Sequence, residues 1–258
     1  MRRLGSREDN MGYKKGLAIY IDILGTKEFD FCNLYKLNQI FHKELFKLKN
    51  KKTLCKKFVT SFSDCAYIIY TINEKDECDE SVFRLFIHDS LDDLNYMIST
   101  IFVNGYMCRG GISYGELYFE ENKKIVFGPA INEAYKLETE AMMPRIIFDD
   151  KLGAKLYEKE NIVIKDKFHK LIVKDTIDNR YFLNYISLFS IFDDSDFDEG
   201  LVKEKIQLGD KEYSFKEYYD ILISNSQKEI KETNDHSIIS KHKWQLRYLK
   251  QNKKEMYG

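Results

Sequence analysis

Two aspartates are placed where a carboxylate needs a specific partner. Asp22 lies inside the apolar run 20–25 (YIDILG), and Asp64 follows Ser63 between two strand-like stretches. A carboxylate in an apolar strand is costly unless it is paired, hydrogen-bonded or bound to a metal. If the two aspartates meet at one sheet edge, they offer the hard oxygen ligands that Mg²⁺ or Mn²⁺ takes together with phosphate oxygens. The simpler alternatives are a helix cap for Asp22 and a turn former for Asp64.

Two further features favour the binding of a phosphorylated ligand. Gly25 allows a tight turn directly after the strand, which exposes backbone N–H groups as a seat for phosphate. Asn132 and Lys136 are four residues apart in a helical pattern, so they share one helix face. An amide and a cation there can hold a ribose and stabilise developing phosphoryl charge. The alternative is an ordinary exposed helix.

The hydrophobic pattern predicts the elements that position these residues. Strand-like runs occur at 17–24, 57–72 (two strands joined at Ser63 and Asp64), 108–119, 123–128, 144–149 and through 162–190. Helical spacing occurs at 33–50, 81–104 and 130–143. The order β-α-β-β-α-β predicts an α+β fold with an antiparallel-rich sheet, helices packed on it and a ferredoxin-like centre. An acidic loop at 193–200 precedes a small helical C-terminal appendage over 200–258.

Composition excludes several classes of protein. The 258 residues are 43% hydrophobic and include 18 Tyr and 18 Phe, so the chain can bury a core and is not intrinsically disordered. A formal net charge of −1 leaves no basic field, so we expect no nucleic-acid partner. The apolar runs are too short for a membrane span, and residues 1–8 have no apolar signal region. Five cysteines without C-x-x-C spacing indicate reduced thiols in a cytoplasmic protein.

Four motifs in a fixed order resemble a known family. They are D-I-L-G at 22–25, F-S-D at 62–64, R-G-G-I-x-x-G-E at 109–116 and F-G-P-A-I-N-x-A-Y-K-L-E at 127–138. Together they are similar to the class III nucleotide cyclases, and more closely to the bacterial pyrimidine cyclases of Pycsar anti-phage defence, over residues 16–185. The resemblance implies the ferredoxin-like class III cyclase fold, with a catalytic domain over 14–192. It also implies conversion of UTP or CTP to the 3′,5′-cyclic nucleotide and pyrophosphate, sensed by a separate effector protein.

The resemblance implies a role for each residue of the metal and phosphate site. Asp22 and Asp64 match the two metal-binding aspartates, and Ile23 matches the position whose carbonyl also touches the metal. Two divalent ions, Mn²⁺ or Mg²⁺, would then be held in each site. The loop whose amides bind the triphosphate is matched by Leu24, Gly25, Thr26 and Lys27.

The same resemblance implies a homodimer with composite active sites. Asn132 matches the asparagine that orients the ribose from the partner subunit. Four residues later the family usually has an arginine that stabilises the transition state, whereas this chain has Lys136. Lysine keeps the positive charge but lacks the planar fork of arginine.

The base-reading positions differ from those of purine cyclases. Thr60 stands where adenylate cyclases generally carry a lysine, and Ile125 stands where they carry an aspartate. Tyr20 shares a strand face with Asp22 and could shorten the base pocket, unless it is a core aromatic. These positions favour a pyrimidine, and UTP is favoured over CTP because uridylate cyclases are commoner in this group. A purine cyclase and a non-catalytic nucleotide-sensing dimerisation module are the alternatives.

Several charged residues are expected to have structural roles. Arg109 would support the glycine-rich strand, and Arg145 would pair with Glu138 or Glu140. The segment that holds Lys170 and Lys174 is near the place where class III enzymes carry a triphosphate lysine.

Overall fold

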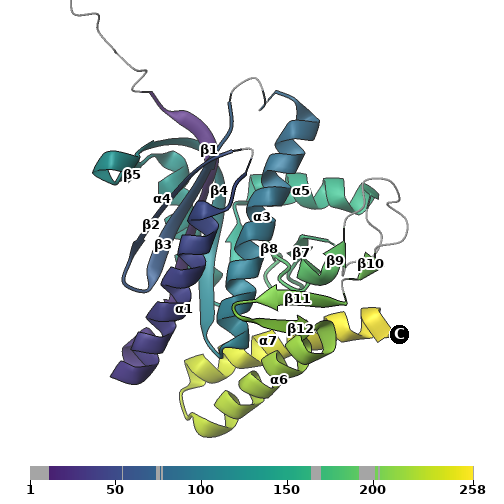
Figure 1. Ribbon diagram of the computed structural model, residues 1–258. Coiled ribbons are helices and arrows are strands. Elements are labelled where there is room, and N and C mark those ends of the chain that lie inside the picture. The colour runs from purple at the N-terminus through teal and green to yellow at the C-terminus, as the bar shows by residue number, and fades with distance from the viewer. Residues whose placement is uncertain are drawn as a thin grey trace, which may run out of the picture.

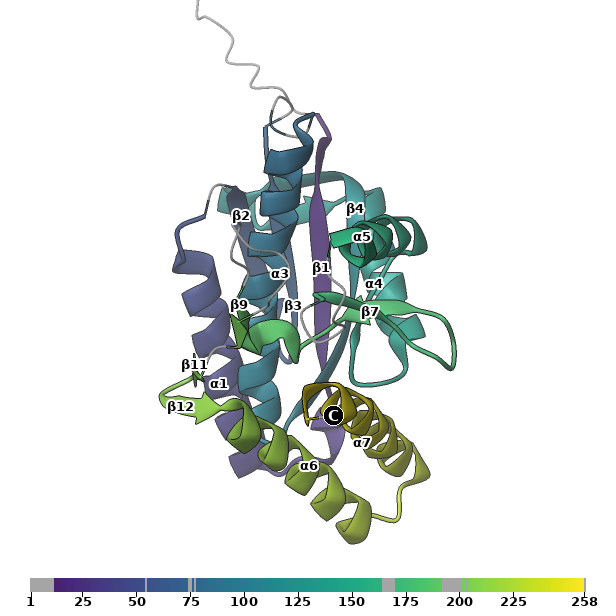
Figure 2. The ribbon, with the colours of Figure 1, turned by 90° about the vertical axis from the view of Figure 1, so that its right-hand side faces the viewer.

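The computed structural model describes residues 12–53, 55–73, 76, 78–163, 170–191, 201–202 and 204–257. Its centre is a mixed sheet with helices α1 (Phe31–Asn50) and α3 (Glu80–Val103) on one face and α4 (Pro129–Ala141) on the other. Figure 1 shows α1 and α3 side by side in front of the sheet, and Figure 2 shows the same layers from the side. The predicted fold class, α+β with an antiparallel-rich sheet, is confirmed.

The strand order is that of a ferredoxin-like sheet. Strand β1 (Lys14–Leu24) lies between β3 (Cys65–Thr71) and β4 (Met107–Glu120), and β2 (Lys56–Phe62) pairs with the outer side of β3. All three pairings are antiparallel. The connection through α1 leads from β1 to β2, and the connection through α3 leads from β3 to β4, as the β-α-β-β-α-β order predicts.

Buried side chains on both faces of β1 explain its near-continuous apolar sequence. Ile19, Ile21 and Ile23 pack toward α1 and α3, whereas Ala18 and Tyr20 pack toward α4. Successive side chains of a strand point to opposite faces, so β1 contributes residues to two separate hydrophobic cores, one on each face of the sheet.

Helices α1 and α3 each begin at an aspartate that caps the helix through its side chain. Asp30 accepts a hydrogen bond from the backbone of Asn33 at the start of α1, and Asp79 caps α3 through Ser81. These caps agree with the predicted helix starts to within two residues.

Further strands extend the sheet beyond β4. β6 (Ile146–Phe148) is parallel to β4, and β8 (Tyr181–Leu183) and β7 (Ile172–Lys174) follow it, while the short β5 (Ile125–Phe127) pairs with the end of β4. Within the described residues, 3₁₀ turns also occur at Thr26–Glu28, Glu121–Lys123 and Ser187–Phe189.

Helix α5 (Asp150–Val163) was not predicted, and its end occupies positions 162–163, where the pattern indicated a strand. Its sequence includes Gly153 and ends in β-branched residues, which favour other structures in isolation. Tertiary packing favours the helix, because Leu152 and Leu156 are buried on one side of it. Gly153 permits its close approach to β8, since a Cβ there would lie 2.7 Å from the Cβ of Tyr181. Residues 164–169 lie outside the described part.

The C-terminal segment is helical, as predicted, but it begins with an unpredicted hairpin. β11 (Lys205–Leu208) and β12 (Lys211–Ser214) precede α6 (Phe215–Glu232) and α7 (His236–Tyr257), and β9 (Ser190–Ile191) pairs with β10 (Leu201–Val202). Ser214 and Glu217 form a capping box at the start of α6. The predicted acidic loop, 193–200, lies outside the described residues.

Helices α6 and α7 pack on the body through buried polar contacts. The Tyr218 hydroxyl lies 3.1 Å from the Ser99 hydroxyl, the Tyr248 hydroxyl donates to Asn184, and Trp244 Nε1 donates to Asp175 at 2.6 Å. Among the described residues, no helix combines the length and the apolar character that crossing a membrane requires.

Candidate active site

The two sequence-predicted aspartates lie together at one end of the sheet. Asp22 on β1 is paired with Cys65 of β3, and Asp64 immediately precedes Cys65 in the β2–β3 turn. The backbone N–H of Ile23 donates to the carbonyl of Asp64 at 3.0 Å, which joins the end of β1 to this turn. The hairpin therefore brings both carboxylates to the same sheet edge.

The predicted phosphate loop adjoins these aspartates. Gly25 has φ 81°, in the left-handed region that favours glycine, and the turn Thr26–Glu28 follows it. The Thr26 hydroxyl donates a hydrogen bond to Oδ2 of Asp64. Lys27 lies near enough to lower the pKa of Asp22, although other groups dominate that pKa. The loop, Asp64 and Asp22 thus form one cluster.

The local electrostatics favour a cation at Asp22. Burial, together with the negative charges of Glu138 and Asp64, raises the pKa of Asp22 to about 6, while Arg109 and Lys27 oppose this shift. Repulsion between carboxylates is relieved when a divalent cation binds among them.

The ligands that the protein offers suit a hard divalent ion. Most of the coordination shell of such an ion is filled by substrate oxygens and water. No group of three or more His, Cys, Asp or Glu ligands occurs in the part of the chain that the structure describes. Two carboxylates, with a nearby backbone carbonyl at Ile23, match the sparse protein ligation typical of Mg²⁺ at phosphate-bound sites. Asp22 and Asp64 are the residues that would hold such an ion.

The predicted base-reading residues Thr60 and Tyr20 stand in one row across the sheet. Thr60 is paired with Tyr67, and Tyr67 with Tyr20, so the three side chains share the face that carries Asp22. The Tyr20 ring centroid is 4.6 Å from that of Tyr67 and 5.3 Å from that of Tyr135. Sequence reasoning did not select Tyr67, although alternation along β3 could have placed it beside Thr60.

Asn132 and Lys136 are exposed on α4, away from the buried side of that helix. Lys136 Nζ lies 3.4 Å from Glu133 and 3.5 Å from Glu140. Helix α4 runs back along β4, with Gly128 beside Leu117 and Ala134 beside Gly111. Both predicted catalytic side chains are therefore on a surface that a second molecule can reach.

Ile125 lies on β5, close to the end of β4. It is paired with Glu120, and its side chain is 40% exposed. Its neighbour Val126 packs against the cluster that contains Tyr20, and Phe119 stacks on Phe58 of β2, two residues before Thr60. The end of β4 and β5 therefore turn back toward the sheet face that carries Thr60 and Tyr20.

Two charged residues that sequence reasoning treated as structural lie in the site. Arg109 of β4 forms an ion pair through Nε with Glu138 of α4, and its Nη2 is 3.9 Å from Oδ2 of Asp22. The spacing of Glu138 from Ala134, one helical turn, is the signal that could have placed it on the face of α4 that covers β4.

The expected partners of Arg145 are wrong. Arg145 is in a structural ion pair, but it bonds to Asp175 at 2.7 Å and to Asp178, and it lies over the Trp244 ring. Glu138 and Glu140 are instead taken by Arg109 and Arg180. The cause is tertiary, because the β7–β8 turn brings two aspartates to Arg145.

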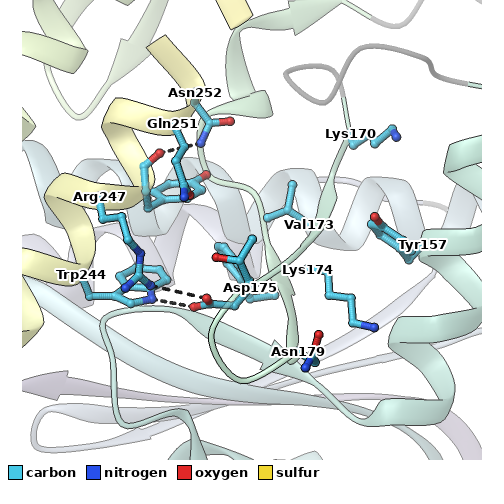
Figure 3. Close-up of a pocket in the computed structure, with 13 residues that line it drawn as sticks. Tyr157, Lys170, Val173, Lys174, Asp175, Asn179, Trp244, Arg247, Gln251 and Asn252 are labelled. Carbon is cyan, nitrogen blue, oxygen red and sulfur yellow. Dashed lines mark hydrogen bonds and ion pairs between the residues drawn. The ribbon is translucent and has the colours of Figure 1, made fainter. Parts of the chain in front are cut away.

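Lys170 and Lys174 line a cavity of about 510 Å³ between α7 and the β7–β8 hairpin. Figure 3 shows Trp244 and Arg247 directed at Asp175 on one side of this cavity. None of the residues that line it is Asp22, Asp64 or Asn132. The structure thus places both lysines in a region different from the aspartate cluster.

Comparisons with known proteins give the following similarities. No protein-family model matches the sequence, and no curated protein matches it. A bacterial light-regulated adenylyl cyclase is similar at 16% identity and TM-score 0.37, over 67% of this chain and 92% of that one. The guanylyl cyclase domain of a RhoGC fusion protein from the aquatic fungus Blastocladiella emersonii is similar at 14% identity and TM-score 0.41, over 66% and 95%. A rhodopsin-guanylyl cyclase catalytic core with converted specificity, in complex with ATPαS, is similar at 11% identity and TM-score 0.38, over 67% and 96%.

Proposed function

We propose that this protein is a nucleotide cyclase, which forms a 3′,5′-cyclic nucleotide and pyrophosphate from a ribonucleoside triphosphate. One observation carries the proposal: Asp22 and Asp64 meet at one sheet edge, directly beside the Gly25 loop. Two carboxylates next to a turn with left-handed glycine are suited to a divalent ion and a polyphosphate together.

In the proposed reaction, the ribose 3′-oxygen attacks the α-phosphorus of the same nucleotide. A bond forms between this oxygen and phosphorus, the bond from phosphorus to the pyrophosphate oxygen breaks, and the 3′-hydroxyl proton is lost. Divalent ions, Mn²⁺ or Mg²⁺, supply activation of the hydroxyl and charge neutralisation when bound. Asp22 and Asp64 hold these ions, and the loop of Leu24, Gly25, Thr26 and Lys27 holds the triphosphate.

The proposed enzyme works as a homodimer with composite sites. Asn132 and Lys136 are exposed on α4, where they can enter the site of a second copy of the chain. In that site Asn132 orients the ribose, and Lys136 stabilises the charge that develops on the phosphoryl group. A lone subunit is therefore expected to be inactive.

The proposed substrate is a pyrimidine nucleotide, with UTP favoured over CTP. The row of Thr60, Tyr67 and Tyr20 contains two aromatic rings and no charged side chain, which suits a small base and offers no charged group to adenine. Ile125 is a further uncharged candidate base contact, and its side chain is exposed. The alternatives are a purine cyclase and a nucleotide-sensing dimerisation module without activity.

The proposed biological role is the production of a second messenger in Pycsar anti-phage defence, where a separate effector protein responds to the cyclic nucleotide. This part rests on the resemblance of the four motifs. The catalytic domain is proposed to span 14–192, with 200–258 as its helical appendage.

A product assay tests the proposed reaction. Purified protein is incubated with Mn²⁺ and each of ATP, GTP, CTP and UTP, and the products are identified by mass spectrometry. We expect cyclic UMP or cyclic CMP, lost in Asp64→Ala and retained in Asp210→Ala, whose aspartate is exposed and pairs with Lys43. Cyclic AMP or cyclic GMP alone would contradict the pyrimidine pocket, and no product from a confirmed dimer would favour the sensing module.

A further inference from the structure

Asp22 and Arg109 face each other across β1 and β4, yet they do not form a close ion pair. The strand register pairs the two residues directly, and Nη2 of Arg109 lies 3.9 Å from Oδ2 of Asp22. Directly opposed side chains have Cβ atoms about 5 Å apart, and charge-assisted hydrogen bonds are about 2.7–2.9 Å long. A guanidinium in this position is therefore near enough to form a direct hydrogen bond with Asp22, and another contact must hold it away.

The restraint comes from Glu138. Its carboxylate forms an ion pair with Nε of Arg109, and its side chain is only 6% exposed, against 27% for Arg109. A buried carboxylate retains a cationic partner strongly because loss of the partner leaves an uncompensated charge. Arg109 is thus bound by the more deeply buried of its two acidic neighbours.

Glycines in β4 put Glu138 in this place. A Cβ at Gly111 would lie 2.2 Å from the carbonyl oxygen of Ala134 and 2.4 Å from Cβ of Leu137, so α4 rests directly on the strand. Glu138 is one helical turn beyond Ala134 on the same face. The close packing brings its carboxylate over the Arg109 position, two residues along β4 from Gly111.

We propose that Glu138 is a positioning residue that holds Arg109 off Asp22 and so keeps the Asp22 carboxylate open to a divalent cation. The inference rests on the proposed function, because it takes Asp22 as a ligand of that cation. Arg109 offsets the negative charge of Glu138, and its guanidinium stays 3.9 Å from the Asp22 carboxylate. The Asp22 oxygens are then left for the ion.

The test measures Mn²⁺ binding directly, by the electron paramagnetic resonance signal of free Mn²⁺, with the full-length protein. In Glu138→Gln, Arg109 is released and closes on Asp22, so the Mn²⁺ dissociation constant should rise about tenfold, as for other residues that orient metal ligands. In the double variant Arg109→Gln/Glu138→Gln the competing cation is gone, and affinity should return to within about threefold of the wild type. A merely structural role of Glu138 does not predict this rescue.

Arg180→Gln is the matched control. Arg180 has similar exposure, 28%, and pairs with Glu140, two residues beyond Glu138 on α4. Its Mn²⁺ affinity should stay within about twofold of the wild type. If Glu138→Gln does not fold, Glu138→Asp replaces it, with an expected weakening of about threefold because the shorter side chain restrains Arg109 less.

The possible failures are distinguishable. Unchanged Mn²⁺ affinity in folded Glu138→Gln, with a wild type that binds Mn²⁺ and makes a cyclic nucleotide, would overturn the role of Glu138 alone. Weakening in Glu138→Gln without rescue in the double variant would also overturn it. If Asp22→Asn binds Mn²⁺ as the wild type does and the wild type forms no cyclic nucleotide, both proposals fail.

Discussion

The hydroxyl of Thr26 donates a hydrogen bond to Oδ2 of Asp64, although the two residues are 38 positions apart in the chain. This contact joins the loop after β1 to the β2–β3 turn, and it leaves the other carboxylate oxygen of Asp64 for a further ligand. This hydrogen bond therefore couples the loop that is proposed to hold the triphosphate to a carboxylate that is proposed to hold the metal.

Removing this hydroxyl should uncouple the two parts. We expect Thr26→Val to lower kcat/KM for the nucleotide about tenfold, because a hydrogen bond to a charged group contributes about 1.5–3 kcal/mol. Steady-state kinetics with saturating Mn²⁺ measure the change, and Thr26→Ser, which keeps the hydroxyl, is the control. Equal losses in both variants would contradict the role of the hydrogen bond.

Metal binding should depend on pH through Asp22. Its pKa is raised to about 6 by burial and neighbouring carboxylates, and a metal ligand must be deprotonated. Mn²⁺ affinity should therefore rise up to about pH 6 and level off above it, with up to about a tenfold loss for each pH unit below. Calorimetric titrations from pH 5 to pH 8 check this. Asp22→Asn, which removes both the ligand and the titrating carboxylate, should bind Mn²⁺ more weakly and show no rise in affinity up to pH 6.

The same raised pKa has the opposite consequence for the metal-free protein. The folded state binds the Asp22 proton more tightly than the unfolded state, so this group stabilises the fold at low pH. That contribution is present below the unfolded value of 3.8 and is lost as pH rises through about 6. Added Mn²⁺ should restore stability at pH 7, which thermal denaturation with and without the ion measures. A melting temperature that Mn²⁺ leaves unchanged would count against an ion at this carboxylate.

Gly111 should be far less tolerant of substitution than Gly115 on the same strand. A Cβ at Gly111 would meet the carbonyl oxygen of Ala134 at 2.2 Å, whereas a Cβ at Gly115 would lie 3.7 Å from Ala130. Gly111→Ala must displace α4 and should cost about 2 kcal/mol or more, the upper part of the range for overpacking. Urea unfolding of Gly111→Ala and Gly115→Ala compares the two, and similar losses would show that α4 can move freely.

His242 should make the C-terminal helices sensitive to acid. It is buried on α7, 3.3 Å from the Ser226 hydroxyl, and burial lowers its pKa to about 4. In the unfolded state His242 takes up a proton near its ordinary pKa of 6.5. The stability that the buried, neutral imidazole contributes is therefore lost as pH falls from 6.5 toward 4.

The free energy of unfolding should therefore fall by up to about 1.4 kcal/mol per pH unit in this window. Urea unfolding at several pH values measures this slope, which His242→Gln should flatten. His236→Gln, at an exposed position, should leave it unchanged. A slope that is the same in all three proteins would assign the acid sensitivity to other groups.

Local sequence patterns predicted most of the elements that surround the site. Continuous apolar strands, a Ser63–Asp64 turn and helical spacing are short-range signals, because they depend on period and turn chemistry within about 20 residues. They were sufficient to bring Asp22 and Asp64 to one edge. They also placed Asn132 and Lys136 on one face of α4.

Long-range packing determined the ion-pair partners and the position of helix α5, which local sequence patterns do not contain. The restraint of Arg109 by Glu138 depends on the register of β4 and on the approach of α4 at Gly111, and the partners of Arg145 depend on the β7–β8 turn. Helix α5 forms against Tyr181 despite a weak local pattern. The sequence by itself therefore determined which residues could do the chemistry and which elements carry them. Only the tertiary structure decided which charges meet, because an ion pair depends on distances between segments that are far apart in the chain.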